Sequence, residues 1–575
     1  MSHFVSVLKT VLLISVLVLY FYLIQDVQAE VIDTNSLALI PKPQIAEWES
    51  GCFTLTKRVN ICIEDDKERL DSIAEFLSGK IAKNSNFKPK VRTTNDSLPE
   101  KNTILLTTKS VDVMLGSEGY ELFVYSDRVM IRAQSPAGIW YGVQTLRQMM
   151  PIEIDSKVKL NNKSWQIPCC KIYDNPAFVW RGFLFDSCRH FQDIDTIKQI
   201  IDLMGYYKLN VFRWNLTEDE AWRIEIKKYP KLTQKGAWRL ENGKTYGGFY
   251  TQKQARDIVR YAKERFITVV PGLEMPGHCT AAIYCYPELS CSQKPFEGQD
   301  KGNRGYFYNA VGRQAYCAAN EDTLGFNEDV ITELLSIFDS PYIALGGDER
   351  PEGQWSKCPR CQAKMKELGF ANRMDRGFDF SIWKREPADA NMCEAQLQYW
   401  YMNQINEFVL SKNRRPTSWV ADYMQYDIPD RQIVEGWNNF SEVLNAVNKG
   451  HEALFNSLWD VYLIFPYSKQ EKLDHKEWPE YYPVIDLQKI YSFSPISQSL
   501  TYEQSKKILG SMACLWTEDT PQEMVFKRTF PRLIAFSEAV WLSQSEKNWD
   551  EFKYRMFRHY RRLDQMKLDY VKLEN

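Results

Sequence analysis

The feature that most constrains the fold is a series of eight short apolar segments in the chain after Asp174. Amphipathic helical patterns over 194–207, 252–265, 327–338 and 393–410 separate several of these segments. Strands that alternate with helices in this way predict an α/β fold, and eight of them predict a (β/α)8 TIM barrel. A doubly wound open sheet is the alternative, but no glycine-rich phosphate-binding loop follows any of the segments. The expected strands are 182–186, 210–216, 268–274, 342–348, 416–421, 432–437, 453–459 and 511–516.

The part of the chain that precedes the barrel has shorter and more mixed signals, typical of an α+β domain of ordinary size. Its expected elements are helices at 67–83 and 135–150 and strands at 103–107, 120–125 and 129–133. The expected organisation is therefore a smaller α+β accessory domain over 30–172, followed by a barrel domain with C-terminal helices over 173–575.

The first 29 residues have the pattern of a signal peptide. Lys9 precedes an apolar run over 11–24, and Val27-Gln28-Ala29 fits a cleavage site with small residues. The run of about 14 residues is short for the roughly 20 that span a bilayer, and a retained membrane anchor is the alternative. We therefore expect entry into the secretory pathway, with secretion or delivery to a lysosome-like compartment, and no stable membrane insertion after cleavage.

The composition excludes one class of partner and leaves another open. The 72 basic and 74 acidic residues give a formal net charge of −2, so no overall positive field would attract nucleic acid. The chain has 17 Trp residues. Most large aromatic side chains fill the core, but sugar-binding clefts also use aromatic faces, which stack on the apolar C–H face of a sugar ring.

The thirteen cysteines predict several disulfide bonds in a secreted protein, and the odd number leaves at least one unpaired thiol or an intermolecular bridge. Cys358-Pro-Arg-Cys361 is a single CxxC pair. A zinc site would need a second such pair or well-placed histidines, so we expect a local disulfide or an ordinary loop there, and no metal. Sequons predict a glycoprotein, and they start at Asn95, Asn162, Asn215 and Asn439.

Carboxylates and tryptophans recur where the expected barrel strands end, which is where barrel enzymes place their active sites. One such residue alone is usually a helix cap or core filler. Together, acidic groups beside aromatic faces are what glycoside hydrolysis requires. No histidine–carboxylate metal cluster and no serine nucleophile motif occurs, so no cofactor is expected. The residues concerned are Asp186, Glu218, Asp219, Glu274, Asp348, Glu349, Asp422, Trp437, Trp459, Trp516 and Glu518.

The most informative segment is Leu345-Gly346-Gly347-Asp348-Glu349 at the end of an apolar strand. Adjacent side chains on a strand point to opposite faces. Where the chain leaves the strand this direction changes, and both carboxyl groups can reach one cavity. The segment resembles the GGDE signature of glycoside hydrolase family 20, the β-N-acetylhexosaminidases.

Further segments resemble the same family in the same order, over most of the chain. They are 135–148, 181–186 with Arg189-His190-Phe191, Met275-Pro-Gly-His278, 514–518 and 530–541. The resemblance implies a family 20 accessory domain before the barrel. It also implies an exo-acting enzyme that removes terminal β-linked N-acetylglucosamine (GlcNAc) or N-acetylgalactosamine (GalNAc) with retention of configuration.

In such an enzyme the substrate's own 2-acetamido oxygen is the nucleophile, an exception to the scheme with two carboxylates. The resemblance assigns Glu349 as general acid and then base. Its pKa is expected to be raised by burial and by the neighbouring Asp348 carboxylate. Asp348 would accept a hydrogen bond from the acetamido N–H, and Tyr462 would donate one to the acetamido oxygen.

The resemblance also implies how the sugar is held. Trp437, Trp459 and Trp516 would surround it, while Arg181 and Glu518 would bind its hydroxyl groups. His278 would be a polar supporting group or a proton relay, with a structural loop histidine as the alternative. The implied partner is a glycan with a terminal N-acetylhexosamine, and a homodimer is possible because family members often form one.

Several positions depart from the family pattern and leave substrate range and rate open. The alternative is a secreted carbohydrate-binding protein on the same fold, with catalysis weakened. A third possibility is an exo-enzyme for a modified or disaccharide unit, because Ile464 replaces a polar residue. The departures are Arg213, Asn215, Gly272, Glu274, Ala344, Ala421 and Ile464.

Overall fold

The computed structural model of the chain divides into two compact units, one centred on Pro43–Asn175 with Glu551–Lys567 and the other on Pro176–Asp550. It describes residues 37–64, 67–94, 100–109, 111–158, 165–241, 243–295, 313–351, 353–370, 393–420, 424, 427–474, 480–497 and 500–572. The expected signal peptide lies outside these residues, as do the sequons at Asn95 and Asn162. Within them, no helix has the length and apolar character needed to cross a membrane.

The first unit is built on a seven-stranded sheet with the order β1-β7-β5-β6-β4-β2-β3. Helices α2 (Lys67–Asn84) and α3 (Pro136–Met149) pack against one another and against strands of this sheet. Ser135 caps α3 by accepting a hydrogen bond from the Ala137 amide, and Pro136 occupies the first turn, where its missing N–H costs nothing. The strands are β1 (Ile45–Leu55), β2 (Asn60–Glu64), β3 (Lys90–Thr94), β4 (Thr103–Thr107), β5 (Tyr120–Val124), β6 (Arg128–Arg132) and β7 (Trp165–Asp174).

The last long helix, α19 (Trp549–Gln565), belongs mainly to the first unit, although the sequence led us to place all C-terminal helices with the barrel. Its Arg562 donates from Nη1 to Asp155 Oδ2 at 2.5 Å and from Nη2 to the Gln148 carbonyl at 2.8 Å. Arg147 also donates to Asp155, from Nε at 2.6 Å. A buried carboxylate shared by two arginines ties this helix to the first unit.

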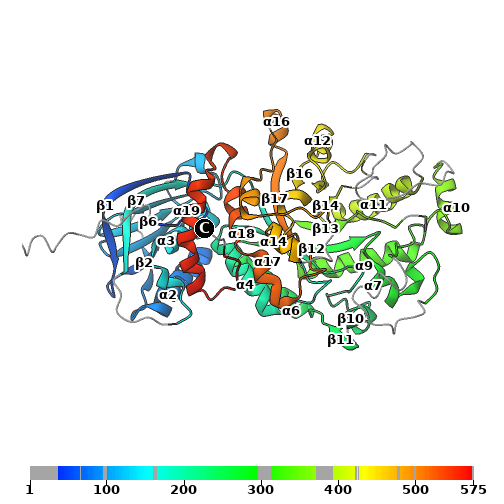
Figure 1. Cartoon of the computed structure of the whole chain (residues 1–575), viewed down its shortest axis with the longest axis horizontal. Coiled ribbons are helices and arrows are strands. Elements are labelled where there is room, and N and C mark those ends of the chain that lie inside the picture. Colours follow the sequence, from blue (N-terminus) through cyan, green and yellow to red (C-terminus); the bar gives the residue numbers. More distant parts are fainter. Residues whose placement is uncertain are drawn as a thin grey trace, which may run out of the picture. The chain divides into compact units, whose positions relative to one another are not determined.

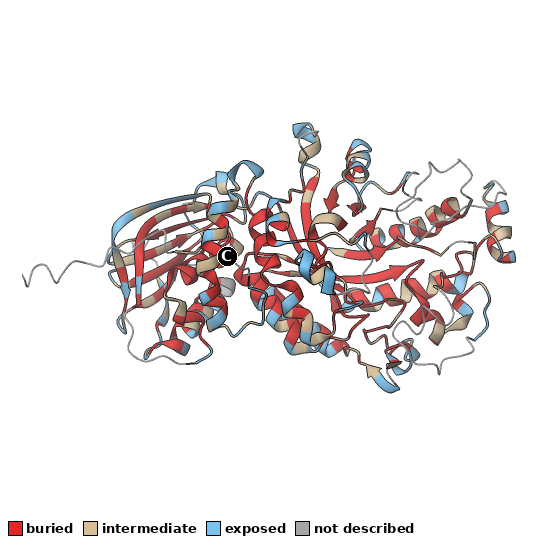
Figure 2. Cartoon of the chain, viewed as in Figure 1, coloured by how far each residue is buried: buried red, intermediate tan, exposed pale blue. Residues whose placement is uncertain are grey.

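The second unit is a closed barrel of eight parallel strands, which confirms the predicted fold. Each predicted segment overlaps a barrel strand, although the one predicted over 453–459 ends at Phe455. Six residue pairs between the last strand and the first, from Gly510↔Trp180 to Leu515↔Phe185, close it. The strands are β8 (Trp180–Asp186), β9 (Val211–Asn215), β12 (Thr268–Met275), β13 (Tyr342–Gly346), β14 (Arg415–Trp419), β15 (Ile433–Gly436), β16 (Ala453–Phe455) and β17 (Ile508–Leu515). Figure 1 labels β12, β13, β14, β16 and β17 among them, and Figure 2 shows that the strands of this unit are mostly buried.

Amphipathic helices cover the outside of the barrel. In α4 (Ile194–Tyr206), for example, Asp193 caps the N-terminus by accepting from the Thr196 amide, and Ile197, Ile200 and Ile201 are buried. The other elements of this unit that bear on its architecture are the hairpin of β10 (Trp238–Glu241) and β11 (Lys244–Gly247) and the helices α6 (Gln252–Lys263), α7 (Thr280–Cys285), α9 (Glu321–Ile337), α10 (Pro359–Glu367), α11 (Cys393–Ser411), α12 (Phe440–Asn448), α13 (Leu458–Val461), α15 (Leu487–Ser492), α17 (Val525–Thr529) and α18 (Arg532–Ala539).

Candidate active site

A pocket of about 300 Å³ opens at the C-terminal ends of the barrel strands, the end at which barrel enzymes act. This volume is at the small end of ligand pockets and suits one sugar ring better than a long chain. Its walls combine acidic and cationic side chains with aromatic ones. The lining residues are Arg189, Glu218, Glu274, His278, Arg313, Asp348, Glu349, Trp437, Leu458, Tyr462, Ile464, Phe465, Tyr481, Tyr482, Trp516 and Glu518.

The Gly-Gly-Asp-Glu segment turns sharply as it leaves β13, and this turn brings both carboxyl groups into the pocket. Gly346 and Gly347 have φ values of 63° and 103°, which strongly favour glycine, and Glu349 has a φ of 42°. A Cβ atom on Gly346 would lie 1.9 Å from Glu274 Oε2. The glycines are therefore required for the turn, and Glu349 is held in a strained backbone conformation of the kind found at functional sites.

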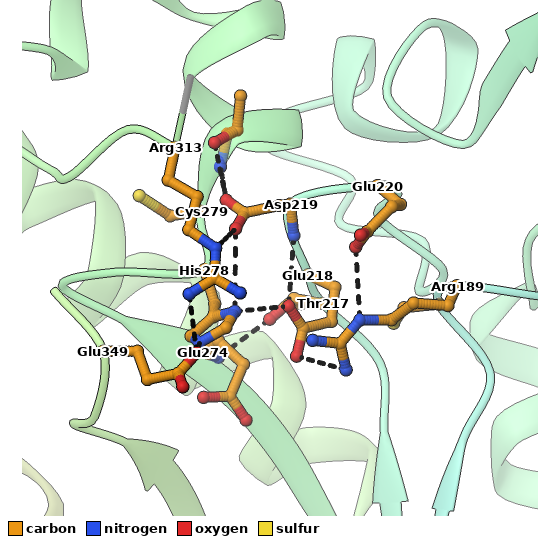
Figure 3. A network of polar contacts seen from close by, with 12 residues as sticks. Arg189, Thr217, Glu218, Asp219, Glu220, Glu274, His278, Cys279, Arg313 and Glu349 are labelled. Carbon is orange, nitrogen blue, oxygen red and sulfur yellow. Dashed lines mark hydrogen bonds and ion pairs between the residues drawn. The ribbon is translucent and has the colours of Figure 1, made fainter. Parts of the chain in front are cut away.

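Two cationic side chains contact the Glu349 carboxylate. Arg313 Nη1 lies 2.6 Å from Glu349 Oε2, and His278 Nε2 lies 3.3 Å from the same oxygen (Figure 3). Burial alone would raise the pKa of Glu349, but the hydrogen bond from His278 and the charge of Arg313 outweigh burial and lower it to about 2. The expectation of a raised pKa for Glu349 is therefore wrong for this structure.

The raised pKa belongs to the neighbouring Asp348. Burial is the main cause, the charge of His278 opposes it, and the charge of Glu349 adds to it. Asp348 Oδ1 is buried and has no hydrogen-bond partner among the described residues. A buried carboxylate oxygen that lines a pocket without a protein partner is suited to accept a hydrogen bond from a ligand.

His278 lies between Glu349 and a second acidic pair, Glu218 and Asp219. Its Nδ1 lies 2.9 Å from Glu218 Oε2 and 3.6 Å from Asp219 Oδ2. Burial lowers the pKa of His278, but the charge and hydrogen bond of Glu218 and the hydrogen bond of Glu349 together raise it well above its ordinary value. The ring is therefore a charged bridge that can pass a proton toward Glu349.

We expect the Arg313→Gln substitution to move the alkaline limb of the kcat/KM profile to higher pH by about 1 unit or more. A cation beside a carboxylate stabilises its ionised form, so removing the cation raises the pKa of Glu349, and the acid keeps its proton to higher pH. The measurement is a pH–rate profile, with Arg260→Gln on α6 as control because that side chain is 69% exposed. An alkaline limb at the same pH in Arg313→Gln and in the wild type would contradict the conclusion that Arg313 lowers the pKa of Glu349.

The structure corrects one assigned sugar ligand. Arg181 lies at the N-terminal end of β8 and is fully buried, and its guanidinium donates to the carbonyls of Lys208 at 3.0 Å and Phe178 at 2.7 Å. It does not line the pocket, because the first residues of a barrel strand lie at the opposite end from the active site. Arg189, in the loop after the same strand, does line it.

Arg189 is held in place by an acidic cluster. Its Nη1 lies 2.9 Å from Glu218 Oε1 and 3.3 Å from Asp186 Oδ2, and its Nε lies 3.2 Å from Glu220 Oε2. The guanidinium carbon lies 5.1 Å from the centre of the Trp516 ring. The Arg189-His190-Phe191 motif contained the signal for this residue, whereas nothing in the sequence pointed to Arg313.

A matched pair of substitutions separates the two arginines. Arg189→Met should raise KM roughly 10- to 100-fold, as expected for the loss of a charged hydrogen bond to a sugar hydroxyl. Arg181→Met should leave KM unchanged and lower the melting temperature, because it leaves two buried carbonyls unpaired. Michaelis kinetics and thermal melts of both variants check this. A KM that rises in Arg181→Met would contradict the placement.

The aromatic wall contains most of the predicted residues. Trp437, Tyr462 and Trp516 line the pocket, and the Tyr462 hydroxyl hydrogen-bonds with Trp516. Trp459 does not line it. The predicted strand over 453–459 ends early and turns into α13, which presents Leu458 to the pocket instead.

Glu518 lines the pocket with a side chain that is 44% exposed. The enclosed surroundings raise its pKa to about 7, with Arg189 at 3.9 Å opposing the shift and Asp186 adding to it. Glu518 therefore lies at the pocket wall beside Arg189, as the prediction for a sugar ligand requires.

Two residues that depart from the family pattern pair with each other beneath the pocket. Arg213 lies 2.6 Å from Glu435 Oε2 and 3.5 Å from Glu274 Oε1, and its guanidinium lies 4.7 Å from the centre of the Trp419 ring. Burial and the nearby carboxylates, with Arg213 opposing them, raise the pKa of Glu274 to about 8. Arg213 and Glu274, which both depart from the family pattern, therefore belong to one charged network that also includes Glu435.

The pocket offers one group of residues with metal-ligand character. Glu218, Asp219 and His278 lie close enough to share an ion. The carboxylate oxygens already have partners within the protein. Glu218 pairs with Arg189, and Asp219 accepts hydrogen bonds from the Thr280 amide at 3.1 Å and from its hydroxyl at 2.5 Å. The group is better explained as support for His278.

Comparison with known families agrees with this arrangement. A family model described as "Glycosyl hydrolase family 20, catalytic domain" matches residues 178–544, and one described as "Glycosyl hydrolase family 20, domain 2" matches residues 36–175. The chain belongs to glycosyl hydrolase family 20. The predicted resemblance is confirmed, and the accessory unit corresponds to the second domain of the family.

Individual members of family 20 are similar to this chain over most of its length. It is 32% identical to a β-hexosaminidase of Porphyromonas gingivalis over 93% of this chain, and it spans 64% of that protein. A family 20 exo β-N-acetylglucosaminidase of Vibrio harveyi, solved with N-acetylglucosamine, has a TM-score of 0.76 at 26% identity, covering 93% of this chain and 78% of that one. A β-N-acetylhexosaminidase of Bacteroides fragilis has a TM-score of 0.74 at 29% identity, covering 92% and 96%.

Proposed function

We propose that this protein is an exo-acting β-N-acetylhexosaminidase that releases terminal β-linked GlcNAc or GalNAc with retention by substrate-assisted catalysis. The observation that carries the proposal is the Asp348–Glu349 pair. One carboxyl oxygen is buried and has no protein partner among the described residues, and the adjacent carboxylate lies 3.3 Å from His278 Nε2. The names of the relatives support the hydrolase and give no support to a binding protein without catalysis.

The proposed reaction starts with the acetamido group of the substrate. Asp348 accepts a hydrogen bond from its N–H, Tyr462 donates one to its oxygen, and that oxygen attacks the anomeric carbon. Because the pKa of Glu349 is lowered, its carboxylate takes a proton from His278 in the same step in which it gives one to the leaving oxygen. Water then opens the bicyclic intermediate with Glu349 as base, and the product retains its configuration.

Exo action is proposed from the size and walls of the pocket. A volume of about 300 Å³ bounded by Trp437 and Trp516 has room for one terminal sugar. Ile464, Tyr481 and Tyr482 complete an apolar and aromatic wall. With Ile464 in place of a polar residue, we infer weak discrimination of the outer hydroxyl groups, and hence activity on both GlcNAc and GalNAc.

Export and the associated modifications are also part of the proposal. The N-terminal sequence supports passage through the secretory pathway, with secretion or a lysosome-like destination. Of the two sequons within the described residues, Asn439 is exposed and Asn215 is fully buried, so glycosylation is proposed at Asn439. Disulfide bonds and a homodimer remain predictions, and all twelve cysteines with described side chains are unpaired.

The test is hydrolysis of the 4-methylumbelliferyl β-glycosides of GlcNAc and GalNAc by the purified secreted protein. Turnover of both sugars is expected, and proton NMR of the first product should show the β-anomer before it mutarotates. Appearance of the α-anomer first would contradict retention. Failure to hydrolyse either sugar by folded protein that binds GlcNAc would contradict the enzyme and favour a binding protein.

A further inference from the structure

Four cysteines from three segments of the chain meet outside the catalytic pocket. Cys291 follows the short helix η4 (Pro287–Leu289), Cys317 precedes α9, and Cys358 and Cys361 lie at the start of α10. Their four Sγ atoms all lie within 4.8 Å of one another, and three of the four residues are buried. The sequence showed one CxxC pair without partners, whereas the fold supplies two partners from 41 to 70 residues upstream.

The spacing of the sulfur atoms fits a tetrahedral cage. The Sγ–Sγ distances are 3.6 Å for Cys317 and Cys361, 3.9 Å for Cys291 and Cys361, and 3.9 Å for Cys317 and Cys358. Four sulfurs at the usual Zn–S distance of about 2.3 Å lie about 3.8 Å apart at the corners of a tetrahedron. The sulfur atoms of a disulfide lie about 2.05 Å apart. The Cys317 sulfur lies at similar distances from those of Cys361 and Cys358, so the geometry does not single out one disulfide partner.

The groups around the sulfurs favour thiolates that hold a cation. Arg360 Nη2 lies 3.6 Å from Cys317 Sγ and also donates to the carbonyls of Ser290 at 3.1 Å and Cys291 at 3.3 Å. The Cys361 backbone amide donates to the Cys358 sulfur. Four thiolates around a divalent ion carry an excess negative charge, which the Arg360 guanidinium would partly balance. A disulfide is neutral and would not be stabilised by this positive charge.

We propose that Cys291, Cys317, Cys358 and Cys361 bind one structural zinc ion. Four protein ligands leave no position for water or substrate, which is typical of a structural rather than a catalytic zinc. None of the four lines the catalytic pocket. The expectation that this chain has no metal site is revised accordingly.

The position of the four cysteines indicates which parts of the structure the ion would stabilise. Cys317 and Cys358 lie on the two segments that bear Arg313 and Glu349. These segments are already joined, because Gln354 donates to the Arg313 carbonyl at 2.8 Å and Trp355 donates to the Tyr316 carbonyl at 2.9 Å. Zinc would fasten the same two segments at their far ends and so hold Arg313 against Glu349.

The test uses the whole wild-type protein, purified without added metal and without chelator. Elemental analysis by mass spectrometry should find one zinc per chain. Titration with a thiol reagent in the presence of a zinc indicator should release that zinc as four thiols react. Removal of zinc by a strong chelator should lower the melting temperature.

Cysteine variants test whether the zinc ion is bound at this site. The Cys317→Ser/Cys358→Ser double variant should lose zinc to background, and Cys285→Ala should keep it, because that buried cysteine lies six positions from Cys291 but outside the cage. Zinc retained by the double variant would overturn the proposal. So would wild-type protein with zinc at background, with stoichiometric iron, or with a disulfide within the four cysteines. These wild-type results decide the question even if the double variant does not fold.

Discussion

Replacing Glu349 by glutamine is expected to lower kcat/KM for a β-linked GlcNAc disaccharide about 10²- to 10⁴-fold. Glutamine keeps the size of the side chain but has no proton to give to the leaving oxygen. The loss should be much smaller for an aryl glycoside whose leaving group is a weak base, because such a group departs without a proton. The measurement is kcat/KM for both substrates with the same preparation.

The contrast between the two substrates is what identifies an acid. A variant that loses the same factor on both substrates would show a disturbed pocket and would contradict the assignment of Glu349. The matched control is Glu503→Gln on α16 (Tyr502–Ser505), whose side chain is 78% exposed. Its kcat/KM should equal that of the wild type on both substrates.

The second large effect is expected at Asp348. The Asp348→Asn substitution removes the negative charge that faces the acetamido group as that group becomes positive. A fixed charge or dipole of this kind at a reacting centre is worth about 10²- to 10³-fold in kcat. Affinity for a thiazoline that mimics the bicyclic intermediate should fall by a similar factor, while affinity for the product GlcNAc should change little. Steady-state kinetics and inhibition constants measure both quantities.

The outcome that would contradict substrate assistance is also specific. If Asp348 itself attacked the sugar, the wild-type enzyme would hydrolyse a β-glucoside without the acetamido group at a comparable rate. We expect no significant turnover of that substrate. Thiazoline affinity that is unchanged in Asp348→Asn would likewise contradict the assigned role.

The barrel could be predicted from the sequence because its signal is local. Each strand is an apolar run of a few residues, and its ends indicate where side chains such as Asp348 and Trp516 emerge. The strand that was misjudged, over 453–459, failed for a local reason too. Leu458 and Trp459 are as compatible with a strand as with the helical turn that they form, and only packing decides between them.

The errors at the site come from contacts between distant segments. Adjacency in the sequence showed Asp348 beside Glu349 and predicted a raised pKa, but Arg313 and His278 reach Glu349 from other loops and reverse the sign. Cys291 and Cys317 join Cys358 by the same kind of long-range approach. Neither spacing nor composition of one sequence contains this information, because it arises only when the loops at the end of the barrel are folded.

The C-terminal helix has a consequence for the order in which the protein can be made. The first unit is discontinuous: Asp155 is synthesised early, and its partner Arg562 is synthesised only after the whole barrel. During translation this carboxylate can pair with Arg147 but not yet with Arg562, and the unit cannot be completed until α19 leaves the ribosome. Nor can the first unit be excised as one uninterrupted fragment. A stop codon that removes α19 would therefore damage the unit that is encoded before the barrel, and not only the end of the chain.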